Sequence, residues 1–243
     1  MIKKLFIILP FVYLLSTQAG YAAFELPGVD LGSETETVAD SVKIMLLLTV
    51  LSVAPAILLL MTSFTRIAIV LSFVRTSLGT QQMPPNQVII GLAMFLTFFI
   101  MSPVFSDIYG QAYQPFIDGK ITQEQAFDTA VEPIKEFMAK HTREKDLNLF
   151  LDYSQQKKPE TIQDIPLHVL VPAFAISELK SAFQMGFMIF LPFLIIDMIV
   201  SSILMAMGMM MLPPVLISLP FKILLFILVD GWHLIVKSLL LSF

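Results

Sequence analysis

Four long apolar stretches divide the chain, and more polar segments separate them. They cover residues 44–62, 88–105, 185–212 and 215–243. A helix needs about 20 apolar residues to cross the hydrocarbon core of a bilayer, and each stretch reaches or nearly reaches that length. Because backbone groups cannot stay unpaired in lipid, helices are the expected structure of all four stretches. The pattern therefore predicts an all-α membrane protein.

The apolar stretches group into two predicted helical hairpins. The first covers residues 44–106, and its loop at 63–87 carries Arg66 and Arg75 and no acid. The second covers residues 185–243, and we expect its bend in "LPPVLISLP" because proline interrupts a helix. Helix-breaking residues of this kind are tolerated at membrane depth only where protein or water satisfies the freed carbonyls. Protein or water is therefore expected beside these prolines.

A polar segment, residues 107–184, lies between the two hairpins and is expected to fold into short helices. Thr122 and Gln125 form a predicted capping box at the start of the first of these. Apolar residues then recur at helical spacing: Phe127, Ala130, Ile134, Phe137 and either Met138 or His141. Pro133 kinks this helix or begins a second one. "KDLNLFLDYS" adds a further aromatic face, and these short helices need a partner to pack against.

The N-terminus has the three parts of a secretory signal peptide in residues 1–22. "MIKK" is basic, "LFIILPFVYLL" is apolar, and small residues precede a cleavage site after Ala22. The apolar part is too short to span a bilayer, and an uncleaved anchor is the alternative. A cleaved signal places residues 23–43 in the periplasm. The positive-inside tendency separately puts the arginine-containing loop in the cytoplasm, so both arguments place residues 107–184 outside it.

Composition supports a membrane protein and excludes several functions. The chain is 56% hydrophobic and 14% charged, whereas a soluble domain is nearer to a quarter charged. A net charge of −4 argues against nucleic-acid binding, and the absence of cysteine excludes disulfides and thiolate chemistry. Phosphate-binding loops, nucleophile elbows and metal-ligand spacings are also missing. We therefore predict neither an enzyme nor a cofactor.

Four charged residues interrupt the second predicted hairpin: Asp197, Lys222, Asp230 and Lys237. An ionised side chain at the bilayer centre costs about 2.5–3.5 kcal/mol on insertion scales, so each needs a partner or water. One interpretation is buried charge pairing within or between subunits. The other is a proton or ion path, which would make the chain a self-sufficient ion channel or transporter.

The two aspartates of this set also raise an enzymatic alternative. A hairpin could bring Asp197 and Asp230 level, and two carboxylates that share a proton activate water in aspartic proteases. Intramembrane aspartyl proteases, however, carry Gly-x-Gly before one aspartate and Tyr before the other. Neither pattern precedes these two residues, so we do not expect a protease.

Four residues of the polar segment are candidates for contacts between subunits. Arg143 and Glu178 flank the segment, and as an inter-subunit pair they would fix the register of a ring. Phe137 and Phe150 belong either to an intramolecular core or to a subunit interface, where aromatic residues are enriched.

A methionine run follows the third apolar stretch. "MAMGMMMLPP" contains Met205, Met207 and Met209 to Met211, five of the 15 methionines of the chain. Methionine is unbranched and adapts to irregular partners, so such residues commonly fill gaps between helices. Gly208 and the two prolines that end the run favour a second interpretation, namely flexible side chains at a helix break that seal a passage and then yield.

Three segments resemble the FliP family, the P subunits of the flagellar type III protein export gate, which is related to injectisome export gates. They are "LVPAFAISELKSAFQMGFMIFLPFLIIDMIVSSILMAMGMMMLPP", "LPFKILLFILVDGWHLIVKSL" and "TSFTRIAIVLSFVRTSLGTQQMPPNQVIIGLAMFLTFFIM". The resemblance covers essentially all of the chain after the signal peptide. It implies membrane-inserted hairpins with a small extracytoplasmic helical segment that assemble into a helical, ring-like pore complex.

The resemblance also implies partners, a place and a site. The partners are copies of the chain itself, the Q and R export-gate subunits, other export-gate and basal-body ring proteins, and the unfolded flagellar proteins that pass through. The place is the flagellar basal body at the bacterial inner membrane, with a large part on the periplasmic side. Met209, Met210 and Met211 would form a gasket that seals the channel, with Met205 and Met207 as supports.

Overall fold

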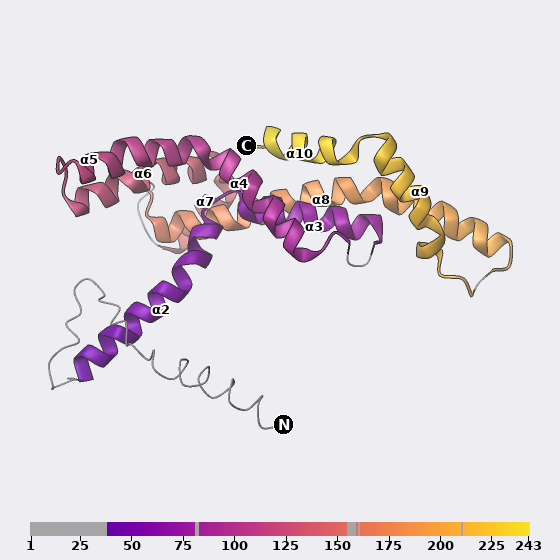
Figure 1. Ribbon diagram of the computed structural model, residues 1–243, viewed down its shortest axis with the longest axis horizontal. Coiled ribbons are helices and arrows are strands. Elements are labelled where there is room, and N and C mark those ends of the chain that lie inside the picture. The colour runs from indigo at the N-terminus through magenta and orange to yellow at the C-terminus, as the bar shows by residue number, and fades with distance from the viewer. Residues whose placement is uncertain (1–37, 81–82, 155–158, 160, 210) are drawn as a thin grey trace, which may run out of the picture. The chain divides into compact units, whose positions relative to one another are not determined.

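A computed structural model describes residues 38–80, 83–154, 159, 161–209 and 211–243. The regular structure of these residues is entirely helical, which confirms the all-α prediction. Figure 1 shows the elements in chain order. They are α2 (Val38–Leu60), α3 (Phe64–Leu78), α4 (Asn86–Ile108), the π-helix η1 (Tyr109–Tyr113), α5 (Gln114–Ile117), α6 (Gln123–His141), α7 (Glu144–Tyr153), α8 (Leu167–Ala206), α9 (Pro214–Leu228) and α10 (Gly231–Leu241).

The chain divides into two units, residues 1–52 and residues 53–243. The described part of the first unit is residues 38–52 of α2. The signal peptide, which we predicted at residues 1–22, lies outside the described residues, as does most of the predicted segment 23–43. All of the other described helices belong to the second unit.

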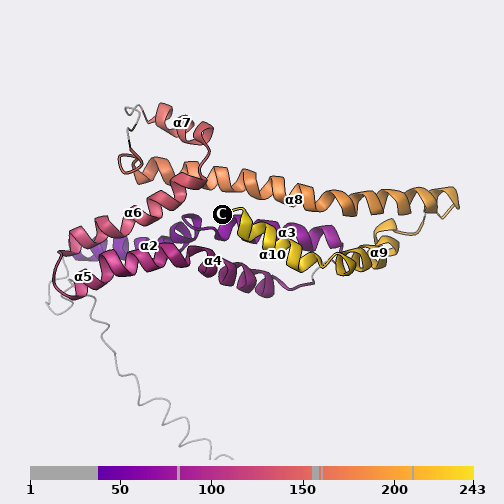
Figure 2. The same cartoon turned by 90° about the horizontal axis from the view of Figure 1, so that it is seen from above.

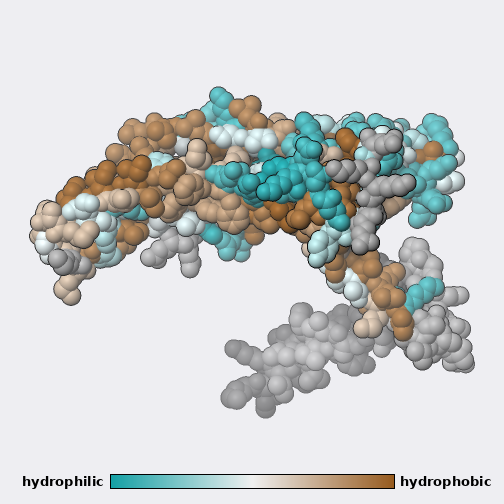
Figure 3. Space-filling view, turned by 180° about the vertical axis from the view of Figure 1, so that it is seen from behind, coloured by the Kyte–Doolittle hydropathy of each residue, from teal (hydrophilic) through white to brown (hydrophobic). Residues whose placement is uncertain are grey.

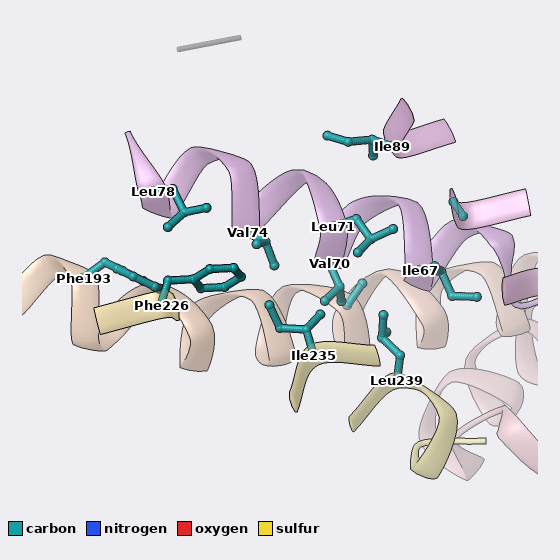
Figure 4. Close-up of a cluster of buried hydrophobic side chains, with 12 residues drawn as sticks. Ile67, Val70, Leu71, Val74, Leu78, Ile89, Phe193, Phe226, Ile235 and Leu239 are labelled. Atoms are coloured by element: carbon teal, nitrogen blue, oxygen red, sulfur yellow. The ribbon is translucent and has the colours of Figure 1, made fainter. Parts of the chain in front are cut away.

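Helix α3 is the centre of the second unit. Ile67, Val70, Leu71 and Val74 recur at three- and four-residue spacing, and each is at most 1% exposed. Figures 1 and 2 show α3 lying beside α8. The first core cluster forms where α3 meets α4, α8, α9 and α10, and ten of its residues are labelled in Figure 4. Gly79 ends α3 in the left-handed conformation, at φ +71°.

This helix replaces the loop that we expected between residues 63 and 87. With 15 residues, α3 is too short to span a membrane, so the length of an apolar stretch does not reveal this helix. Its apolar stripe was nevertheless visible in the sequence. Because Arg66 is only 5% exposed, it belongs to the protein interior, and its charge no longer supports a cytoplasmic loop.

The helices of the polar segment pack against the first part of α8, which provides the partner that they lack by themselves. The second core cluster joins α6, α7 and α8, and its buried members are Met61, Met138, Leu151, Ile165, Val169, Leu170 and Phe174. The predicted capping box is confirmed, since Thr122 and Gln125 exchange both of its hydrogen bonds. Helix α6 continues through Pro133 as one helix.

The turn that leads into α8 is fixed by Asp164. Its carboxylate accepts the hydroxyl of Thr161 at 2.6 Å and the backbone N–H of Thr161 at 3.1 Å. Because these bonds favour the charged form, they lower the pKa of the Asp164 carboxyl below its ordinary value. Lys135 of α6 donates to the carbonyl of Gln163 in the same turn at 2.5 Å. The turn before α8 is thereby tied to α6.

The second predicted hairpin differs from expectation in three places. Helix α8 begins at Leu167, so the boundary that we set at residue 185 falls inside a 40-residue helix. The break before α9 covers residues 207–213, and Pro220, expected in the bend, lies within α9. Helices α9 and α10 do not form one straight span, because they bend by 62° at a short break.

Three of the described helices are long and apolar enough to cross a membrane. They are Val42–Leu60, the continuous helix Asn86–Ile117 that joins α4 to α5, and Leu167–Ala206. The bent pair α9 and α10 passes the same test when it is taken together. Figure 3 shows brown, hydrophobic surface on the arm formed by the end of α8 and by α9, while teal residues gather towards the end that carries α5 and α6.

Close packing of α3 on α8 yields a first testable prediction. A Cβ added at Gly186 would lie 2.5 Å from the ring of Phe73 and 3.0 Å from its Cβ, so the ring cannot simply swing away. We expect Gly186→Ala to lower the free energy of unfolding by about 1–3 kcal/mol through overpacking. Gly91→Ala is the matched control, because no atom lies within 4 Å of its added Cβ. The control should gain about 0.5–1 kcal/mol from helix propensity. Thermal unfolding of both variants in detergent measures the difference, and equal midpoints would contradict the prediction.

Candidate functional site

The methionine run forms a turn between α8 and α9, residues 207–213, which we call the methionine turn. After α8 ends, Gly208 takes the left-handed conformation at φ +77°. The backbone N–H of Met209 donates to the carbonyl of Leu204, and that of Gly208 donates to the carbonyl of Met205, both at 3.0 Å. This pair of bonds is a Schellman motif, which favours glycine at this position. The helix is thereby stopped by local chemistry.

The other end of the turn is set by two prolines. Pro213 occupies the N-cap of α9, and Pro214 is its first helical residue. Proline fits this place because its missing N–H would be unpaired there in any case. The turn therefore has defined ends on both sides.

The described methionine side chains of the run point away from the chain's own core. The exposed fractions are 60% for Met205, 56% for Met207, 46% for Met209 and 99% for Met211. Met210 lies outside the described residues. Much of the surface of these side chains is therefore left uncovered by the described part of the chain.

Asp197 and Lys222 form an ion pair that joins α8 to α9. The Nζ atom of Lys222 lies 2.6 Å from Oδ2 of Asp197 and donates to the backbone carbonyl of Ser77 at 3.2 Å. The hydroxyl of Ser218 donates to the other carboxylate oxygen of Asp197. Lys222 is 3% exposed. Both charges therefore find their partners within one chain, one of the two arrangements that the sequence left open.

A second buried ion pair joins α3 to α8. Arg66 contacts both carboxylate oxygens of Glu178, and its Nε lies 2.9 Å from Oε2. Its remaining donors bind the carbonyl and hydroxyl of Ser242 at 2.7 and 3.0 Å. The guanidinium carbon also lies 3.9 Å from the centre of the Phe243 ring, a cation–π contact. Arg66 therefore holds α3, α8 and the residues after α10 together.

Glu178 and Arg143, which we expected at a subunit interface, each form an ion pair within this chain. The exposure of Glu178 is zero, and its carboxylate is occupied by Arg66 of the same chain. Arg143 pairs instead with Asp146, at 2.6 Å. Each side chain of the expected Arg143–Glu178 pair thus has another partner in its own chain, and pairing between subunits stays a prediction.

Phe137 and Phe150 are half-buried and pack against the second core cluster. The ring of Phe137 lies 6.0 Å from that of Phe174 in an edge-to-face arrangement, and 6.0 Å from that of Phe243 in a stacked one. Each residue thus contributes to the intramolecular core and still presents part of its surface. The role at a subunit interface stays a prediction.

Asp230 and Lys237 are exposed and, in the described part of the chain, belong to no ion pair. Asp230 stands at the bend between α9 and α10 with φ +50°. It follows Lys222 by eight residues, which is about 12 Å along a helix, while Asp197 is held at Lys222. The two aspartates therefore do not share a proton, and the geometry gives no support to a protease.

The sequence did not predict the roles of four polar residues in these networks, which are Arg66, Ser77, Ser218 and Ser242. Arg66 was assigned to a loop, although its spacing with Ile67, Val70 and Val74 places it on a helix. Ser77 takes part through its backbone carbonyl, which no side-chain pattern reveals. Ser218 stands four residues before Lys222, and this helical spacing could have placed both on one face. Among the described residues, no group of three metal-ligating side chains is found.

Comparison with known proteins gives a consistent result. The model of the FliP family matches residues 47–239, which contain the methionine turn and both buried ion pairs. The flagellar biosynthetic protein FliP of Bacillus subtilis (strain 168) is 71% identical over 211 residues, which are 87% of this chain and 96% of the relative. The protein of the same name from Pectobacterium carotovorum subsp. carotovorum is 52% identical over 90% of this chain and 86% of the relative. That of Aquifex aeolicus (strain VF5) is 46% identical over 95% and 97%.

Proposed function

Since this chain belongs to the FliP family, we propose that it is a pore-forming subunit of the flagellar type III protein export gate. Membership of the family makes it a component of the flagellar export apparatus. The finer proposal is that copies of the chain, together with the Q and R subunits, surround a channel through which unfolded flagellar proteins cross the inner membrane. The methionine turn is proposed to seal that channel between passages.

The observation that carries the proposal is the exposure of the methionine side chains at a defined helix break. Met211 is 99% exposed and Met209 46% exposed, on a turn whose backbone is fixed at both ends. Large apolar side chains left in the open mark a surface that another molecule covers. Side chains with three rotatable bonds and a polarizable sulfur conform to varied surfaces. Several copies of such a turn, directed at one axis, would close a passage and yield to an incoming chain.

Exposed apolar surface outside the turn supports assembly. Only 22% of the most apolar part of Asn86–Ile117 and 11% of that of Leu167–Ala206 is buried within this chain. Lipid or neighbouring subunits therefore have to cover these faces. We propose that neighbouring subunits cover much of them, with a large part of the complex on the periplasmic side.

A self-sufficient ion channel receives less support from the geometry. Asp197 and Lys222 satisfy each other and are backed by Ser218 and Ser77, so neither offers a free proton-carrying site. Charge-driven transport would then depend on Asp230 and Lys237 alone. Ion flux through the purified chain in liposomes, in the absence of Q and R subunits, separates the two functions. A saturable or voltage-dependent current would favour the channel.

The gasket is tested by replacing Met209, Met210 and Met211 with Ala together. We expect the triple variant to assemble with its partners and to leak ions across the inner membrane, because alanine leaves the constriction too wide to close. Leakage is measured as loss of membrane potential in cells that express the gate. Met188→Ala/Met198→Ala is the matched control, since both residues are exposed methionines within α8 rather than in the turn. The control should assemble and seal. A triple variant that seals as well as the unchanged protein would overturn the gasket.

A further inference from the structure

A single ammonium group joins three helices next to the methionine turn. Lys222 of α9 contacts Asp197 of α8 and the carbonyl of Ser77 in the last turn of α3. Ser218, one turn earlier on α9, adds a hydroxyl bond to the same aspartate. We call this group of residues the charge lock. Among the described residues, Ser218 and Lys222 provide all of the side-chain hydrogen bonds from α9 to other helices.

The contact with Ser77 is electrostatically favourable. The C-terminal end of a helix carries partial negative charge and unpaired carbonyls, and a cation placed there stabilises it. Lys222 occupies that position for α3. The end of α3 also approaches α9 closely, because a Cβ added at Gly79 would lie 3.4 Å from Val215 and 3.8 Å from Nζ of Lys222. Helix α9 therefore packs against the C-terminal end of α3.

The charge lock closes a loop that contains the whole methionine turn. Asp197 precedes the turn on α8, and Lys222 follows it on α9, so their ion pair ties the two arms that carry residues 207–213. At Gly208 the turn borders open space, since a Cβ added there meets no heavy atom beyond its chain neighbours within 4 Å, and Met211 is 99% exposed. Its position thus depends on the helices at its two ends.

Stability alone is a weak reason for this arrangement. Buried ion pairs are costly to desolvate, and their replacement by apolar residues of similar size is often neutral or stabilising. Helix α9 is otherwise apolar around much of its surface, and apolar contacts are compatible with more than one register. Directional bonds to Asp197 and to the Ser77 carbonyl select one register. The network is therefore suited to placing α9 rather than to strengthening it.

We propose that the charge lock positions the methionine turn for sealing. Asp197, Lys222 and Ser218 act as positioning residues, which hold α9 on α3 and α8 so that the methionine side chains meet at the closure. Movement of α9 away from α3 would withdraw them. This inference rests on the proposed gasket function and adds to it the residues that set where the gasket lies.

The test uses a double variant, Asp197→Leu/Lys222→Met, in the complete gate. Removing both charges leaves no unpaired ion, so the variant is expected to fold and assemble. We expect its ion leak per assembled complex to rise towards that of the methionine triple variant. Arg66→Met/Glu178→Leu is the matched control, because it removes a buried ion pair between α3 and α8 that does not enclose the turn. The control should leak no more than the unchanged gate.

Two further variants distinguish positioning from general stability. Lys222→Arg keeps the charge and hydrogen-bond donors opposite Asp197 and should seal like the unchanged gate. Ser218→Ala removes only one hydrogen bond to Asp197 and should give a small leak with normal assembly. Failure of the Asp197→Leu/Lys222→Met variant to assemble, or its assembly with normal sealing, would overturn the inference. If the methionine triple variant leaks and Asp197→Leu/Lys222→Met seals, the gasket stands and only the role of the charge lock is rejected. A sealed triple variant rejects the gasket itself.

Discussion

Replacing Glu178 by Ala is expected to lower the free energy of unfolding by about 3–5 kcal/mol. The carboxylate is completely buried, and its two oxygens accept from Nε and Nη2 of Arg66, along one edge of the guanidinium. Its loss leaves a cation inside the protein without its counter-ion, and the desolvation of that cation is no longer offset. Because Arg66 also holds Ser242 and Phe243, the segment after α10 should loosen as well. Thermal unfolding in detergent, followed through the fluorescence of the single tryptophan, Trp232, measures the effect.

Two comparisons make this result specific. Arg66→Met/Glu178→Leu removes both charges and should recover most of the lost stability, since no ion is then left unpaired. Asp146→Ala breaks the partly exposed pair with Arg143 and should cost far less, because ion pairs near solvent contribute only about 0–1 kcal/mol. If Glu178→Ala were no less stable than Asp146→Ala, the buried pair would not exist as described.

Local signals predicted local structure well. The capping box at Thr122 was correct because its two hydrogen bonds join residues only three positions apart. Gly208 and Pro213 stop α8 and start α9 through backbone preferences that do not depend on distant residues. The existence of the helices was equally predictable, because apolar length alone requires hydrogen bonds within each segment.

Length alone, however, misled the assignment of α3. This helix is too short to span a membrane, and it lies between two apolar stretches that we expected a loop to connect. The rule that intramembrane charges need partners indicated that Asp197 and Lys222 would be paired. It could not say which partners, and Asp230 and Lys237, for which it also expected partners or water, belong to no ion pair in the described part of the chain. Pairing over 112 residues, as between Arg66 and Glu178, is a property of the packed fold.

In the candidate site, too, some features were predictable from the sequence and others only from the folded structure. The composition marked the methionine run as unusual, but only the structure shows that the side chains of Met209 and Met211 are exposed. The contact of Lys222 with the end of α3 had no signal in side-chain chemistry, because a backbone carbonyl accepts the bond. Residues that act through the backbone are therefore the part of this site that the sequence conceals.

Phe174→Ala is expected to release α6 and α7 from α8, at a cost of about 3–5 kcal/mol. The Phe174 ring is fully buried in the second core cluster and touches Phe137 of α6 edge to face. Alanine leaves a cavity at the junction on which these short helices depend, since they have no separate core. Phe127→Ala is the matched control, because Phe127 lies on α6 but is 66% exposed and contributes little to packing. Limited proteolysis of the purified protein should cut Phe174→Ala rapidly within residues 123–153 and leave the control as resistant as the unchanged chain. Equal resistance of both variants would mean that α6 and α7 are held by contacts other than those with α8, and the predicted roles of Phe137 and Phe150 between subunits would then gain weight.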